Sequence, residues 1–264
     1  LGAAAAPGAV LAGFDFPIGL PAAYAALAGV DDFRAALTGF GTGRWVQVFE
    51  PARDEDEISV ERPFFPAGRA VAGNAARLAA GLGLEPAQLL RQCDRAHAGR
   101  RAAAALFLTQ GAQQAGKAAI AGWRDLLQPA LTRSDPPVHL WPFDGPLAEL
   151  LGRPGVVVAE IYPTEFHARL GIRFRSAGGK GSAPARAAQA PALERWAAAA
   201  GVELTPGMHS SLAEGFERGG DDAFDAVVGL FGMLDTLLGR GPSPEPSDPQ
   251  VRRVEGWMLG LAAP

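Results

Sequence analysis

The stretch Val10-Leu-Ala-Gly-Phe-Asp-Phe-Pro-Ile-Gly-Leu-Pro21 decides the fold that we expect. An apolar run leads to a single acid, Asp15, and is ended by Pro17, Gly19 and Pro21. Apolar residues on both alternations, bounded by turn-forming residues, are typical of a strand buried on both faces of a parallel sheet. Asp15 then lies at the carboxyl end of that strand, where ligands bind in open α/β sheets.

A second stretch, Val156-Val-Val-Ala-Glu-Ile-Tyr-Pro163, has the same order of residue types. Again an apolar run meets one acid, Glu160, and ends at a proline. Two parallel strands bring their carboxyl ends to the same edge of a sheet, so we expect Asp15 and Glu160 to lie at that edge. This pair is the main functional signal in the sequence.

Length and composition indicate a globular chain with a large core. The chain has 264 residues, of which 48% are hydrophobic and 20% charged. We expect a single α/β domain over residues 1–264, with a helical insertion at about 67–131. The net charge of −4 gives no general attraction to nucleic acid, so a site for a polyanion would have to be a local basic patch.

The sequence also predicts the compartment. Cys93 is the single cysteine, which excludes an intrachain disulfide framework and fits a reducing compartment. No apolar segment reaches membrane-spanning length, because acids or prolines interrupt each candidate. We therefore expect a cytoplasmic protein without a membrane partner.

The remaining pattern predicts further elements. Residues 21–40 suit two short helices with Asp31 or Asp32 as an N-cap, and the runs 44–49 and 58–62 suit a peripheral hairpin. Further helices are predicted at 70–82, 86–108, 113–131, 145–152 and 164–170, with Thr164 as a cap, and further strands at 138–143 and 155–162. After a loop at 176–191, helices are predicted at 191–200, 210–218 and 222–238, with Ser211 and Glu214 as a capping box.

The helix that opens with Asp221-Asp-Ala-Phe-Asp225 supplies a third set of carboxylates. Asp222 and Asp225 are three residues apart and share one helical face. The same acids also suit an N-cap and the positive end of the helix dipole, so both interpretations stay open.

Converging carboxylates have a specific chemical use. They raise one another's pKa unless a cation neutralises them. Oxygen ligands without a Cys or His cluster suit Mg²⁺ or Mn²⁺. Two such ions about 4 Å apart activate water and stabilise the leaving oxygen in phosphodiester hydrolysis. Asp15, Glu160 and Asp225 are the expected metal ligands, and Asp222 is a further expected catalytic acid.

Several short segments together resemble a known family. These segments are Gly13-Phe-Asp-Phe-Pro-Ile-Gly-Leu-Pro21, Trp141-Pro-Phe-Asp144, Ala159-Glu-Ile-Tyr-Pro163, Asp222-Ala-Phe-Asp-Ala226 and Glu255-Gly-Trp257. In this order they resemble the domain of unknown function numbered 429, described as predicted RNase H-like nucleases. The closing Asp-x-x-Asp-Ala is also similar to the pattern of RuvC-type junction resolvases.

The resemblance implies a three-layer ribonuclease H-like sheet flanked by helices. It places Asp15 and Glu160 on sheet strands, and Asp222 and Asp225 on the last core helix. In that fold an opening hairpin carries the first metal-binding aspartate. Residues 1–8 look like the helix that follows such a hairpin, so we expect the hairpin and its aspartate to be absent from this chain.

Three basic residues are candidates for phosphate contacts. Lys180 lies in Gly178-Gly-Lys-Gly-Ser182, which departs from a phosphate-binding loop because Gly181 follows the lysine. Arg91 and Arg95 could form a basic face for a phosphate backbone, or an ordinary solvated surface. Cys93 and His97 are four residues apart on a predicted helix. A cysteine in such a helix is more often part of the core than a nucleophile.

These observations predict a metal-dependent nuclease or phosphodiesterase that uses Mg²⁺ or Mn²⁺ and acts on nucleic acid or another phosphoester. The alternative is a catalytically inactive RNase H-like module that binds nucleic acid, a nucleotide or a protein partner. A phosphotransferase of the actin-like ATPase type would need glycine-rich phosphate loops, and none is convincing here.

Overall fold

The computed structural model describes residues 8–69, 72–97, 100–110, 114–133, 135–174, 179–242 and 245–262. They form two compact units. The sheet unit contains the described residues of 8–160 and 245–258, and the helical unit contains those of 161–242 and 259–262. The prediction of one domain stays a prediction. Within the described residues, no helix combines the length and the apolar character that crossing a membrane requires.

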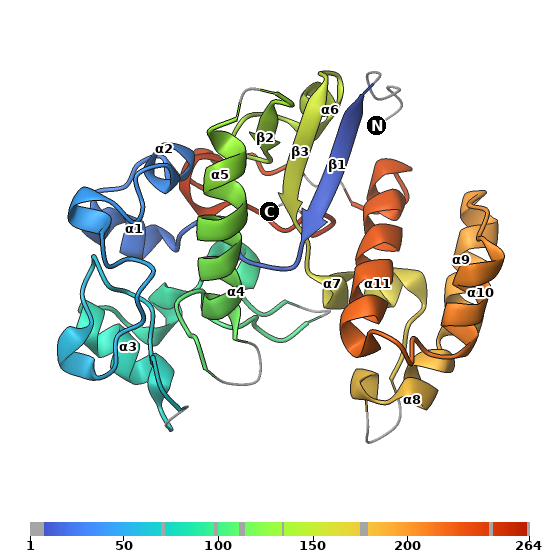
Figure 1. Ribbon diagram of the computed structural model, residues 1–264, viewed down its shortest axis with the longest axis horizontal. Coiled ribbons are helices and arrows are strands. Elements are labelled where there is room, and N and C mark those ends of the chain that lie inside the picture. Colours follow the sequence, from blue (N-terminus) through green and yellow to red (C-terminus); the bar gives the residue numbers. More distant parts are fainter. Residues whose placement is uncertain are drawn as a thin grey trace. The chain divides into compact units, whose positions relative to one another are not determined.

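The sheet unit is built on three parallel strands, β1 (Ala9–Phe14), β2 (Val138–Leu140) and β3 (Gly155–Glu160). Their order is β1-β3-β2, and Figure 1 shows β1 and β3 side by side with their arrowheads at the same end. The register pairs Phe14 with Glu160, so the two strands end together. The prediction of a mixed α/β chain with a parallel sheet is confirmed.

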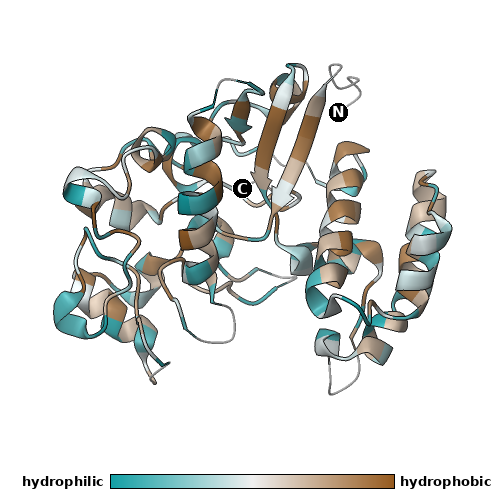
Figure 2. Cartoon of the chain, viewed as in Figure 1, coloured by the Kyte–Doolittle hydropathy of each residue, from teal (hydrophilic) through white to brown (hydrophobic). Residues whose placement is uncertain are grey.

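The two longer strands differ in burial. Both carry the hydrophobic colouring of Figure 2, and β3, between the other two strands, is almost entirely buried. In contrast, β1 is half-buried and Val10 is 53% exposed. The prediction that β1 is buried on both faces is therefore wrong. The strand is half-buried because it lies at one end of the strand order, where it pairs with β3 alone among the described strands.

The helices of the sheet unit are short. They are α1 (Ala22–Ala28), α2 (Phe33–Leu37), α3 (Asn74–Leu82), α4 (Ala115–Ala121), the π-helical turn η5 (Gly122–Leu127), α5 (Gln128–Leu131) and α6 (Leu147–Leu151). The N-cap prediction for α2 is confirmed, since the Asp32 side chain accepts a hydrogen bond from Ala35 N. The predicted helix starts at Ala70 and Gln113 lie outside the described residues, as does the predicted helix end over 1–8 apart from Gly8.

The predicted peripheral hairpin does not form. Residues 43–45 and 55–57 are the short 3₁₀ turns η1 (Gly43–Trp45) and η2 (Glu55–Glu57), and a lone bridge joins Ser59 to Arg62. The physical reason is burial. Trp45, Val48 and Phe49 are buried, and this spacing belongs to a turn of helix rather than to an alternating strand.

The predicted helix over 86–108 is also wrong. The chain forms two 3₁₀ turns, η3 (Pro86–Leu89) and η4 (Gln92–Asp94), and then continues in non-helical conformation. Arg91, between the turns, is extended and fully buried. Its guanidinium is drawn inward by carboxylates, and this contact outweighs the helical preference of the neighbouring alanines.

The helical unit contains α7 (Pro163–Leu170), α8 (Ala183–Ala187), α9 (Ala190–Ala200), α10 (Pro206–Ala213) and α11 (Gly220–Leu237). The helix α11 packs on α7 through its glycines. A Cβ on Gly232 would lie 2.1 Å from the Phe166 ring, and one on Gly229 would lie 2.5 Å from Ile161 Cδ1. Glycine at these positions allows the two segments to approach closely.

Several capping predictions in this unit are wrong. Thr205, not Ser211, caps α10, by accepting a hydrogen bond from Met208 N. Tyr162 rather than Thr164 occupies the N-cap position of α7. The N-cap of α11 is Gly219 in the left-handed conformation, so neither Asp221 nor Asp222 caps that helix. Residues 183–187, predicted as loop, form α8, while residues 175–178 lie outside the described part.

Candidate functional site

The predicted site residues are divided between the two units. Asp15, Arg91, Arg95 and Glu160 belong to the sheet unit. Lys180, Asp222 and Asp225 belong to the helical unit. Each group is therefore described within its own unit.

Glu160 is the last residue of β3. Its carboxylate forms a buried ion cluster with Arg91 and Asp94, which is named here the arginine cluster. Arg91 Nη1 and Nη2 each donate to a Glu160 oxygen at 2.7 Å. Arg91 Nε and Nη2 donate to Asp94 at 2.9 and 2.8 Å. All three residues are at least 97% buried, with relative exposures of 0% for Arg91, 1% for Asp94 and 3% for Glu160.

The arginine cluster fixes Glu160 in place. Both of its oxygens accept hydrogen bonds from Arg91, and Oε2 also accepts one from Ile18 N at 2.7 Å. Burial raises the pKa of Glu160, and the Arg91 charge opposes that rise. Paired and hydrogen-bonded in this way, Glu160 serves the fold and has no oxygen facing solvent for a substrate.

Glu255 adds a third buried carboxylate beside this cluster. It lies at the end of the π-helical turn η7 (Val251–Glu255) and is 2% exposed. Its oxygens accept hydrogen bonds from Ala22 N at 3.1 Å and Gln92 N at 3.0 Å. Glu255 thus joins three segments that are far apart in the sequence. Neither Asp94 nor Glu255 was predicted to have a role from its residue type alone.

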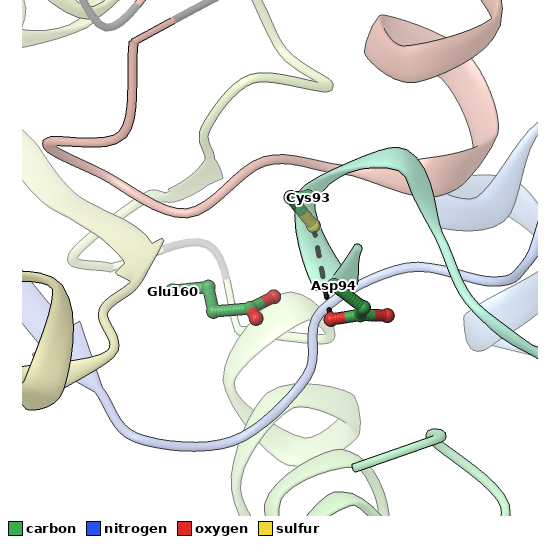
Figure 3. Close-up of side chains that lie close together, drawn as sticks. All are labelled: Cys93, Asp94 and Glu160. Atoms are coloured by element: carbon green, nitrogen blue, oxygen red, sulfur yellow. Dashed lines mark hydrogen bonds between the residues drawn. The ribbon is translucent and has the colours of Figure 1, made fainter. Parts of the chain in front are cut away.

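Cys93, Asp94 and Glu160 each place one possible ligand atom within 4.8 Å of the others, so these three residues could hold a metal ion. Figure 3 shows the Cys93 thiol beside Asp94 and the Glu160 carboxylate facing the pair. Two observations oppose the fit. Arg91 already binds both carboxylates, and burial raises the pKa of the Cys93 thiol, whereas a metal needs the thiolate. A metal ion here would have to displace Arg91.

The same geometry corrects the prediction for Arg91 and confirms that Cys93 is a core cysteine. Arg91 does not face a phosphate backbone, because it is fully buried among carboxylates. Cys93 lies in a 3₁₀ turn and is a buried thiol, not an activated nucleophile. Arg95, in contrast, is exposed, and Asp15 is exposed just beyond the end of β1.

The helical unit brings two of the predicted residues into contact. Lys180, in the 3₁₀ turn η6 (Gly179–Gly181), forms an ion pair with Asp225 Oδ2 on α11. His167 on α7 is close enough to feel both charges. Lys180, Asp225 and His167 are named here the Lys180 site. The sequence pointed to Lys180 and Asp225, but nothing in the spacing of the histidines singled out His167.

Two polar atoms of the Lys180 site are left without a partner. Within the described part of the chain, Asp225 Oδ1 and His167 Nε2 are buried and make no hydrogen bond. Burial lowers the pKa of His167, and the nearby Lys180 charge adds to this effect against the pull of Asp225. His167 is therefore neutral at physiological pH, and its imidazole can accept a proton.

A buried arginine holds the turn that carries Lys180. Arg186 on α8 donates to Lys180 O at 2.6 Å and to Gly215 O at 2.8 Å. Arg186 is 4% exposed, so these bonds are shielded from water. Lys180 itself keeps 42% of its side chain exposed, and Asp225 keeps 13%. The Lys180 side chain can therefore be reached from solvent.

Asp222 does not join this site. It lies with Asp221 in the exposed first turn of α11, where the two acids complement the helix dipole. Asp225, three residues further along α11, is partly buried, whereas Asp222 is exposed. Of the paired acids, Asp225 is the one that contacts Lys180.

Comparison of the chain with family models, with curated proteins and with solved structures finds no match.

Proposed function

We propose that this chain is a ribonuclease H-like hydrolase of phosphodiester bonds and that the Lys180 site carries its chemistry. The observation that carries the proposal is the Lys180–Asp225 ion pair beside a neutral His167, with two buried polar atoms left unpartnered. The parallel strands β1 and β3, which end together at Phe14 and Glu160, agree with the same proposal. The resemblance to the family numbered 429 adds the expectation of nuclease activity.

Each member of the Lys180 site has a chemical role in this proposal. Lys180 binds the phosphate, because its side chain is partly exposed and its ammonium group can exchange the contact with Asp225 for a phosphate oxygen. His167 accepts or returns a proton at Nε2, since the neutral ring is the dominant form. Asp225 places a negative charge beside Lys180, and its Oδ1, which makes no hydrogen bond, can accept a further ligand.

The proposed cofactor is Mg²⁺ or Mn²⁺, held with the help of Asp225. The unpartnered Oδ1 fits a hard cation, because carboxylate oxygen is the ligand that these ions prefer. Glu160 does not fit, since Arg91 occupies both of its oxygens. When bound, the ion would supply activation of a water molecule.

The alternative function is a module that binds nucleic acid, a nucleotide or a protein partner without cleaving it. One observation favours it. Glu160, the acid expected to be a metal ligand, is used by the arginine cluster. With Asp225 as its one carboxylate, the Lys180 site would then bind phosphate through Lys180 and would not complete a two-metal centre.

The two functions separate in a hydrolysis assay. We expect the purified chain to cleave bis(p-nitrophenyl) phosphate with Mn²⁺ or Mg²⁺ present, and Asp225→Asn and Lys180→Gln each to slow cleavage by about a hundredfold or more. Asp221→Asn is the matched control, because Asp221 is exposed on the same helix. Cleavage that is absent in the unaltered chain, or unchanged in both variants, would contradict the hydrolase proposal.

A further inference from the structure

A concave feature lies in the sheet unit, beside the hydrogen bond between Ala22 N and Glu255. It is a pocket of about 350 Å³ between α1, the turn that follows it, and the segment 249–254. Its floor is made of small apolar side chains, namely Ala22, Ala25, Val30 and Val254. This volume falls in the range of pockets that bind small molecules.

Two opposite charges also line the pocket, Asp31 after α1 and Arg253 on η7. Both are exposed. Across the described ranges of the chain, neither side chain forms an ion pair or a hydrogen bond. Asp32, the neighbour of Asp31, is already used as the cap of α2. Asp31 and Arg253 are therefore available to a ligand.

We propose that this pocket binds a small aliphatic zwitterion, the class of the free α-amino acids, with its carboxylate on Arg253 and its ammonium on Asp31. A ligand with only a negative charge would be repelled by Asp31, and one with only a positive charge would be repelled by Arg253. A zwitterion satisfies both residues, and its aliphatic part covers the floor of alanine and valine.

The pocket wall is held in place before any ligand arrives. Glu255 directly follows Val254, and its carboxylate accepts the hydrogen bond from Ala22 N, so the two sides of the pocket are joined. The backbone bond from Leu20 N to Val254 O, at 2.9 Å, adds to this connection. A wall that is already ordered lowers the entropy cost of binding.

The test is calorimetric titration of the full chain with L-leucine, with isocaproate and isoamylamine as analogues that lack the ammonium and the carboxylate respectively. We expect L-leucine to bind in the millimolar range and each analogue to bind about tenfold more weakly. Arg253→Gln and Asp31→Asn should each weaken L-leucine binding by a similar factor.

Arg252→Gln is the matched control, because Arg252 is the exposed neighbour of Arg253 and does not line the pocket. Both altered residues are on the surface, and the unfolding temperature of each variant checks that the fold is kept. The proposal is overturned if L-leucine does not bind, if either analogue binds equally well, or if Arg252→Gln weakens binding as much as Arg253→Gln does.

Discussion

The side chain of Arg91 determines the conformation of the chain around it. Its guanidinium bonds two carboxylates that lie 3 and 69 positions away in the sequence, and all three side chains are buried. An ion pair buried in this way contributes little net free energy against an apolar replacement of the whole group, but removal of one partner leaves uncompensated charge. Substitution of Arg91 alone is therefore expected to be strongly destabilising.

We predict that Arg91→Met lowers the free energy of unfolding by about 3–5 kcal/mol, because Asp94 and Glu160 are left buried without a cation. Urea unfolding followed by circular dichroism measures the loss. Arg95→Met, at an exposed position four residues away, should change the free energy by less than about 0.5 kcal/mol. If the two substitutions lower the free energy of unfolding equally, the arginine cluster does not account for the stability of this region.

His167 gives a pH prediction at the same scale. Its pKa is lowered in the folded chain, so the unfolded chain takes up the proton first as the pH falls below about 6.5. The contribution of neutral His167 to stability is therefore complete above that pH and is lost progressively below it. His167→Gln should make the free energy of unfolding less dependent on pH in this window than it is in the unaltered chain.

The control for His167→Gln is His209→Gln, at an exposed histidine of the same unit. Unfolding is measured in urea at several pH values between neutral and mildly acidic. The interpretation fails if His209→Gln flattens the pH dependence as much as His167→Gln does.

The elements show which local signals in the sequence were sufficient. The strands β1 and β3 were predictable because each is a continuous apolar run between turn-forming residues, and α2 because Asp32 precedes it. The helix predicted over 86–108 does not form, although an alanine-rich sequence favours a helix where nothing opposes it. What opposes it is the burial of Arg91, which depends on partners that a local pattern cannot reveal.

Glycines of α11 give a prediction at the scale of the element. Gly232→Ala should destabilise the chain by about 1–3 kcal/mol, because the added Cβ would meet the Phe166 ring and force α7 and α11 apart. This outweighs the gain of up to about 1 kcal/mol that alanine brings to a helix. Thermal and urea unfolding measure the change.

Gly207→Ala is the matched control in α10, since the nearest atom to an added Cβ there is Thr205 Oγ1 at 4.0 Å. We expect it to leave stability unchanged or to raise it by up to about 1 kcal/mol. A stabilising Gly232→Ala would mean that α7 and α11 do not pack closely.

For the whole molecule, the sequence predicted the class of fold better than the site. The parallel sheet and the Lys180–Asp225 contact involve residues that the patterns had pointed to. The return of residues 245–258 to the sheet unit, where Glu255 bonds Ala22 and Gln92, was not predictable. Such a contact joins distant parts of the chain, and neither partner carries a local signal of it.

Lys180 is the residue proposed to bind phosphate, and the sequence makes a direct test possible. The chain contains two lysines, Lys180 and the exposed Lys117 of α4, so selective isotope labelling of lysine gives one side-chain signal for each in a nuclear magnetic resonance spectrum. During titration with inorganic phosphate, we predict that the Lys180 signal shifts and saturates while the Lys117 signal stays in place. Equal shifts of both signals, or a Lys180 signal that does not move, would contradict phosphate binding at Lys180.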